Sequence, residues 1–242
     1  MLIAPNADRV TAEQAFAVAT PAHTRSWKPV PYRDCIEITR SVIANHLDRE
    51  VLSEDFALGR KGLHLFGLWT LKSDADGNCL SIGMRQSLDK SFALGLVGGG
   101  QVTVCSNLMF CSDDVHIVRK NTTNVLADFR EQAVAAIVGA EGAHTRLQGD
   151  METMQSIAVP TVRGAEIMGH ALYEGVLKPQ QAVVAMNAWK DAPHAEFEPR
   201  NLWSVYNAFT EGLKKGPAGS IIDRHTRAHD FILRAADDDT VN

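Results

Sequence analysis

The residues best suited to chemistry in this chain are lysines and arginines that stand close to aromatic residues in its first half. Proteins that bind single-stranded nucleic acid hold the phosphates with cations and stack bases on aromatic rings, at about 1 to 3 kcal/mol per base. The pattern predicts a DNA-binding surface made of Trp27, Lys28, Arg33, Arg60, Lys61, Trp69, Arg85, Lys90, Arg119 and Lys120. Each residue also has an ordinary interpretation, since strand aromatics usually pack in cores and single cations usually serve solubility.

The glycine triplet Gly98–Gly100 is a second candidate, because glycine-rich loops can hold phosphate groups. The P-loop pattern requires a lysine followed by Ser or Thr at the start of a helix, whereas Gln101 and Val102 follow here. We therefore interpret the triplet as a tight turn that joins two strands.

A histidine pair near the end of the chain is a third candidate. His225 and His229 are four residues apart, so a helix would place both imidazoles on one face, as metal ligands require. No third ligand has a matching spacing, and Arg224 and Arg227 stand beside them. We predict a solvated helix face, with no metal and no cofactor. No nucleophile motif occurs either, so the sequence predicts a protein that is not an enzyme.

Size and charge narrow the class of protein. The chain has 242 residues, 45% of them hydrophobic, which is enough for a substantial core. The net charge is −5, and residues 1–130 carry 14 Lys or Arg against 14 Asp or Glu, so the negative balance lies in the second half. Four cysteines without CxxC spacing indicate reduced thiols. With no signal peptide or membrane-spanning run, we expect a cytoplasmic protein.

The elements that would position these residues change in type along the chain. Hydrophobic patterning predicts helices at 11–20 and 34–47, and a hairpin formed by 63–71 and 79–84. Further strands are predicted at 91–97, 101–110 and 116–118. Helices then follow at 124–147, 151–177, 179–189, 199–213 and 220–235. The fold class is α+β, a single domain over 1–242. An antiparallel sheet of about four or five strands in 1–123 packs with the helical part 124–242.

Four short motifs carry a resemblance to a known family. They are R-x-S-x-D-K from Arg85, V-x-V-C-S-N-L-x-F from Val102, R-K-x-T-T from Arg119, and W-x-x-Y-N-A-x-T-E from Trp203. Their order resembles a family of phage- and plasmid-borne proteins of unknown function. The chain is also similar to the single-stranded-DNA-binding transcription cofactors of podoviruses that carry a virion RNA polymerase.

The resemblance implies a bacteriophage protein that acts in viral transcription, replication or recombination within the host cell cytoplasm. Its partners would be single-stranded DNA and RNA polymerase, or another replication or transcription protein. We also expect a homo-oligomer and no association with membranes. The DNA-binding hypothesis rests on residues as well as on resemblance, and among the predicted residues Arg85, Arg119 and Lys120 fall inside the matching motifs.

Two alternatives stay open at this point. The acidic second half, with its terminal Asp237–Asp239, is consistent with an effector that binds a host or viral enzyme and recruits or inhibits it. Scattered carboxylates leave a metal-dependent nuclease as another possibility. The first predicts a stable protein complex without DNA affinity, and the second predicts cleavage in the presence of magnesium.

Overall fold

The computed structural model describes residues 7–72, 78–102, 108–109, 116–119, 125–214 and 220–240. The chain divides into two compact units. Unit 1 consists of Met1–Gly99 and Asp113–His144, and unit 2 of Gly100–Ser112 and Thr145–Asn242. Each unit has a hydrophobic core of its own. The single domain expected over 1–242 stays a prediction.

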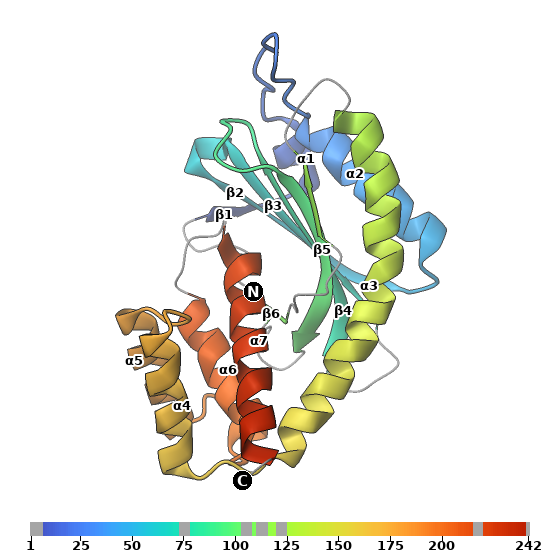
Figure 1. Cartoon of the computed structure of the whole chain (residues 1–242). Helices are drawn as coiled ribbons and strands as arrows, with labels where there is room; N and C mark the ends of the chain where they lie inside the picture. The colour runs from blue at the N-terminus through green and yellow to red at the C-terminus, as the bar shows by residue number, and fades with distance from the viewer. Residues whose placement is uncertain are drawn as a thin grey trace. The chain divides into compact units, whose positions relative to one another are not determined.

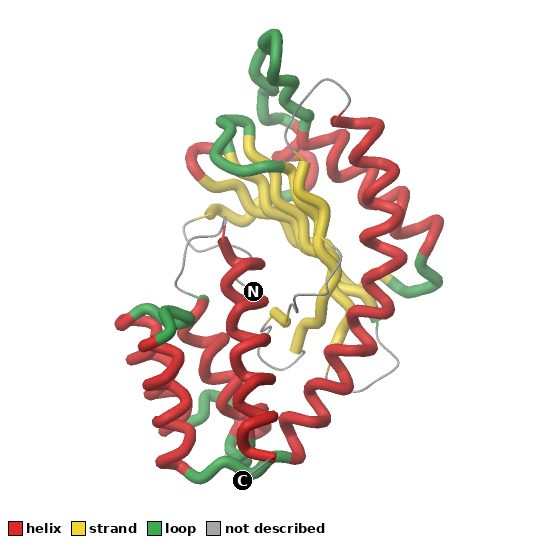
Figure 2. The backbone as a smooth tube through the Cα atoms, viewed as in Figure 1, coloured by secondary structure: helices red, strands yellow, loops and turns green. Residues whose placement is uncertain are grey.

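An antiparallel sheet is the centre of unit 1. Its strands, yellow in Figure 2 and labelled in Figure 1, follow one another in chain order: β1 (Ala7–Val10), β2 (Val51–Gly59), β3 (His64–Leu71), β4 (Asn78–Ser87) and β5 (Leu94–Val102). Two short strands, β6 (Leu108–Met109) and β7 (His116–Arg119), both pair with β5, β6 near its end and β7 near its start. The predicted hairpin, now β3 and β4, is confirmed.

Helices cover one face of this sheet (Figure 1). The helix α1 (Ala12–Phe16) begins at Thr11, whose side chain accepts a hydrogen bond from the Gln14 amide. The helix α2 (Tyr32–His46) buries an apolar face, and its Thr39 hydroxyl lies 3.8 Å from the Met84 sulfur on β4. The first part of α3 (Val125–Ser156) packs against β5 through Ala140.

The glycine triplet Gly98–Gly100 lies inside β5, so its interpretation as a turn between two strands was wrong. A Cβ atom placed on Gly98 would lie 2.3 Å from the Cβ of Ala140, far inside van der Waals contact. Glycine is therefore needed where β5 and α3 approach closely, and not for a change of chain direction.

Unit 2 is helical in most of its described part. It contains the end of α3 and four further helices: α4 (Thr161–Tyr173), α5 (Pro179–Lys190), α6 (Leu202–Leu213) and α7 (Ile221–Thr240). With the sheet of unit 1 these helices confirm the α+β class. The helix predicted to end at Leu147 is longer: α3 continues through Gly149 to Ser156. Pro160 stands directly before α4.

The most buried element of unit 2 is α6. Trp203 and Tyr206 stack at 5.6 Å between ring centroids within the core of unit 2. No helix in the described ranges is long and apolar enough to cross a membrane.

The prediction that His225 and His229 lie on a solvated helix face is wrong. Both are buried on α7, and the His229 side chain is 0% exposed. Its Nε2 lies 2.9 Å from Oδ2 of Asp150 on α3, and its ring meets the ring of Tyr206 edge to face. The pair was mistaken for a polar face because the adjacent arginines and aspartates suggested solvent, whereas α7 turns its histidines inward.

Candidate nucleic-acid interface

Two turns and a connector meet at one end of the unit 1 sheet. The first turn, Arg60–Gly62, joins β2 to β3, and the second, 88–93, joins β4 to β5. His64 pairs in register with both Gly59 and Ser87, so both turns leave the sheet at the same end. We call the residues gathered there the loop cluster: Trp27, Arg60, Lys61, His64, Arg85, Asp89, Lys90 and Phe92.

Arg60 connects the two turns. Its Nη1 lies 2.9 Å from Oδ2 of Asp89 and donates to the Ser91 hydroxyl at 2.8 Å. His64 Nε2 lies 3.1 Å from the same carboxylate oxygen of Asp89. Partial burial raises the pKa of Asp89, but the hydrogen bonds from Ser91 and the nearby His64 together lower it more, so the net pKa is below its ordinary value. The carboxylate therefore fixes the relative position of the turns.

Cations lie over aromatic rings in this cluster. The Lys90 ammonium is 4.9 Å from the centre of the Trp27 ring, which brings the connector before α2 onto the second turn. The Arg85 guanidinium is 5.7 Å from the centre of the Phe92 ring, and that ring also packs against His64 at 4.7 Å. Trp27 and Phe92 are half-buried, so part of each ring is accessible to solvent. Such rings can offer a face to a base.

Three cations of the cluster have left-handed backbone conformations. The φ angles are +48° at Arg60, +57° at Lys61 and +66° at Lys90. Residues with a Cβ atom adopt this region at a cost of about 1 to 3 kcal/mol each, and such residues concentrate at functional sites. All three side chains are exposed at the turns. The turns thus hold their charges toward solvent in a fixed geometry.

Trp69 does not belong to this surface, and its prediction as a DNA-binding residue is corrected. Its side chain is 0% exposed in the core of unit 1, and its Nε1 donates to Glu54 at 2.7 Å. Phe56 packs on its ring edge to face. A base cannot reach the ring without displacing core side chains.

The remaining predicted residues do not belong to the loop cluster. Lys28 is exposed beside Trp27 in the connector. Arg33 lies on α2, where its guanidinium is 4.5 Å from the centre of the Phe16 ring and 3.6 Å from Glu37, so it belongs to the contact between α1 and α2. The backbone of Arg119 pairs with Leu94 at the start of β5, directly after the second turn. Lys120 lies outside the described residues.

Sequence reasoning missed the part that His64 plays in this cluster. His64 begins β3, and its ring contacts the Asp89 carboxylate through Nε2 and packs edge to face with Phe92, both from the turn between β4 and β5. A single histidine at the start of a strand gives no signal in sequence. Only the strand register reveals it, because that register places Ser87 opposite His64.

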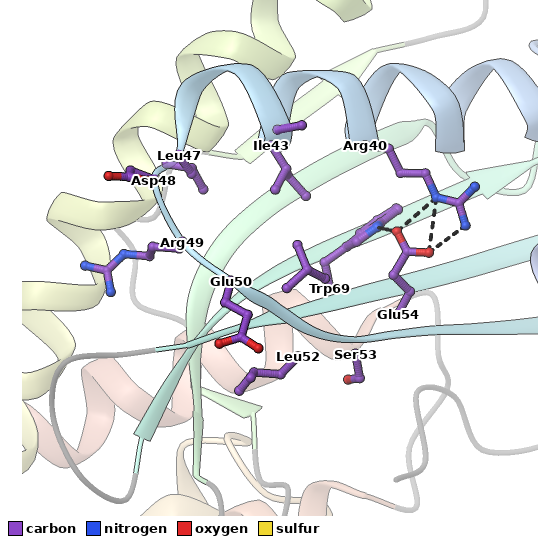
Figure 3. Close-up of a pocket in the computed structure, with 12 residues that line it drawn as sticks. Arg40, Ile43, Leu47, Asp48, Arg49, Glu50, Leu52, Ser53, Glu54 and Trp69 are labelled. Atoms are coloured by element: carbon purple, nitrogen blue, oxygen red, sulfur yellow. Dashed lines mark hydrogen bonds and ion pairs between the residues drawn. The ribbon is translucent and has the colours of Figure 1, made fainter.

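A groove of about 820 Å³ opens elsewhere on unit 1, between the end of α2 and β2 (Figure 3). The Glu54 carboxylate beside it accepts hydrogen bonds from Arg40 Nε at 2.9 Å and from Trp69 Nε1 at 2.7 Å. Hydrogen bonding to Glu54 raises the pKa of Arg40 above its ordinary value. The carboxylate is thereby held in an ion pair. In the parts of the chain that the structure describes, no group of three or more His, Cys, Asp or Glu side chains could hold a metal ion.

Comparison of the chain with protein-family models, with curated proteins and with solved structures found no match. The resemblance to mobile-element proteins therefore stays a prediction.

Proposed function

We propose that the protein binds single-stranded DNA at the loop cluster, without catalysing a reaction. The observation that supports this best is the contact between Lys90 and Trp27. It joins a phosphate-binding cation to a stacking ring from a distant part of the chain, which is the combination that single-strand binders use. Phe92 on the same turn repeats the combination with Arg85 of β4.

Local charge supports the same proposal. The cluster holds four permanent cations, Arg60, Lys61, Arg85 and Lys90, and Lys28 lies beside it. Asp89 is the one carboxylate among its eight residues, and it already accepts from Arg60. The cluster therefore carries more positive than negative charge, although the whole chain carries −5. Binding would be tolerant of sequence and sensitive to salt, because phosphate contacts release counterions.

The sequence resemblance supports a role in viral transcription, replication or recombination, with RNA polymerase or another protein of these processes as a partner. Under this proposal the DNA contacts lie on unit 1, and the helices of unit 2 provide surface for protein contacts.

The test is a fluorescence-anisotropy titration with labelled single-stranded and duplex oligonucleotides of equal length, at two salt concentrations and with magnesium. We expect tighter binding to the single strand, weaker binding at the higher salt, and intact oligonucleotides.

Lys61→Gly and Lys90→Gly remove charge and suit the left-handed backbone, so folding is preserved. Together they should weaken binding several-fold and reduce the slope of log K against log salt by about 0.7 per lost phosphate contact.

The matched control is Lys72→Ala, which removes an exposed lysine of unit 1 just after β3, at the end of that strand away from His64. It should leave the affinity unchanged. Two further variants, Trp27→Ala and the combined Arg119 and Lys120 substitutions, test the stacking ring and the predicted cation pair. Equal affinity of wild type and the lysine variants would overturn the loop cluster as the interface. No binding at either salt would favour the protein-partner function, and cleavage with magnesium would favour a nuclease.

A further inference from the structure

The hairpin of α4 and α5 exposes apolar side chains on its outer face. Tyr173 is 93% exposed, Val162 70% and Val183 61%, and Leu172 and Met186 are exposed as well. These five are most of the nine exposed large hydrophobic residues found among the described residues. Single exposed apolar side chains need no explanation, but a cluster on one supersecondary unit indicates a contact surface.

Gly169 lies in the middle of that face. Val162, Glu166, Gly169 and Tyr173 follow one another at spacings of four, three and four, so they form one line along α4. A Cβ atom on Gly169 would meet nothing within 4 Å, so no contact inside the chain requires glycine there. Glycine costs a helix interior about 1 kcal/mol relative to alanine. The line therefore has a notch beside a protruding tyrosine.

The register of the hairpin fixes what lies beside this notch. A Cβ on Gly164 would lie 2.4 Å from the Trp189 ring, so these residues share a height in the antiparallel pair. With a rise of about 1.5 Å per residue, Gly169 is then level with the stretch between Val183 and Met186 on α5. The same register places Glu166 and Lys190 within about one helical turn of each other, measured along the helix axes.

We propose that the outer face of the α4–α5 hairpin binds the same face of a second copy of this chain. A twofold axis parallel to the helices leaves each residue at the same position along the helix axis in both copies. It places α4 of each copy against α5 of the other, in a four-helix arrangement. The notch at Gly169 then receives Val183 or Met186 of the second copy. Tyr173 covers the beginning of its α5.

Charge complementarity favours a second copy of the chain as the partner of the outer α4–α5 face. In this arrangement Glu166 of each copy reaches Lys190 of the other, so the twofold axis forms two ion pairs. Both charges are exposed on the outer face, and the contact that Glu166 makes inside the chain is a 3.5 Å ion pair with Arg163. A partner with a different sequence would need to match this acid, this base and the notch together.

The size of the face sets the strength of the contact. Two helices of this length present roughly 400 Å² on one side. Stable dimers usually bury about 800 Å² per partner. We therefore expect a weak dimer, with a dissociation constant in the micromolar range or above.

Sedimentation velocity over a concentration series, from low micromolar to several hundred micromolar, tests the proposal. Gly169→Gln adds bulk and helix propensity at the notch. Gly149→Gln is its matched control, since Gly149 is an exposed glycine of α3 that also has open space around its Cβ. Both variants should raise the melting temperature of the dilute protein, and only Gly169→Gln should raise the dimer dissociation constant, by about tenfold or more.

Charge reversal tests the arrangement itself. Glu166→Lys and Lys190→Glu should each weaken the dimer, and the double variant should restore it to within a few-fold of wild type. A wild-type protein that is monomeric over the whole range would overturn the proposal. So would a dimer that Gly169→Gln leaves intact, or one that the double reversal fails to restore.

Discussion

Gly98 controls the distance between β5 and α3. The strand and the helix approach so closely that Ala140 occupies the space of a side chain at position 98. Small residues on both elements allow this contact, and the core of unit 1 continues from there through Ala136 and Ala133 on α3. One residue therefore fixes the separation of two layers.

Gly98→Ala should destabilise unit 1 by about 1 to 3 kcal/mol, because the added methyl group forces the strand and helix apart. Urea denaturation followed by circular dichroism measures the change. Gly149→Ala is the control, and it should stabilise the protein by up to about 1 kcal/mol because its Cβ meets open space. Equal stability of Gly98→Ala and wild type would show that β5 and α3 can separate without cost.

Residue type alone could not separate Trp27 from Trp69. Both stand near cations in sequence, yet one lies in the loop cluster and the other in the core. From Leu65 to Leu71 every residue of β3 is buried, so alternation along this strand does not distinguish two faces. Five residues of the predicted cation–aromatic pattern lie in the loop cluster, namely Trp27, Arg60, Lys61, Arg85 and Lys90. Trp69 does not, because it lies within this buried part of β3.

The turn 88–93 is closed by internal hydrogen bonds and contains the Asp89 carboxylate. Ser87 accepts from the Phe92 amide and donates to the Phe92 carbonyl, which closes the turn, and Asp89 accepts from the Ser91 amide at 2.9 Å. Arg60 of the neighbouring turn and His64 at the start of β3 contact the same carboxylate. An ionised Asp89 therefore orders both turns of the loop cluster.

The free energy of unfolding should consequently depend on pH through Asp89. Its pKa in the folded protein is below the ordinary 3.8, so the stabilisation is fully present above that value and is lost as the pH falls through the folded pKa. Asp89→Asn should be less stable than wild type near pH 6, and the difference should shrink below pH 4. Denaturation at a series of pH values measures this. A constant difference would show that the carboxylate charge contributes nothing.

The helices and the central hairpin could be predicted from hydrophobic periodicity, but β1 and β2 could not. Ser53, Glu54 and Asp55 interrupt the apolar pattern of β2, whose first four residues are exposed. Arg9 on β1 donates a hydrogen bond to the Asp55 carboxylate in an ion pair, and such a pairing across distant segments leaves no local signal. The glycine triplet was misplaced for the opposite reason, since local turn chemistry was overridden by packing against α3.

At the scale of the whole molecule, each unit has its own core. Phe209 on α6 stacks on Phe231 of α7 in unit 2, and Leu80 on β4 lies in the core of unit 1. One boundary between the units falls inside α3, between His144 and Thr145, and another inside β5, between Gly99 and Gly100. Sequence could not reveal the boundary in α3, because the helical pattern continues across those residues without a proline or a polar linker.

Two cavity-forming substitutions test whether the cores act separately. Phe209→Ala should cost about 3 to 5 kcal/mol and Leu80→Ala about 2 to 5 kcal/mol, because each leaves a cavity. In native-state hydrogen exchange, Phe209→Ala should accelerate amides of α4 to α7 and spare β2 to β4, with the reverse for Leu80→Ala. Acceleration of all amides by either variant would instead indicate one cooperative unit.

The four tryptophans differ in what surrounds them. Trp69, Trp189 and Trp203 are buried, whereas Trp27 lies half-buried under the Lys90 ammonium. Their fluorescence therefore has one component that small quenchers in solvent reach. The neighbouring positive charge attracts iodide and repels caesium, so quenching by the anion should exceed quenching by the cation. The protein thus carries an intrinsic optical reporter at Trp27, and a ligand at that surface can be followed without any label.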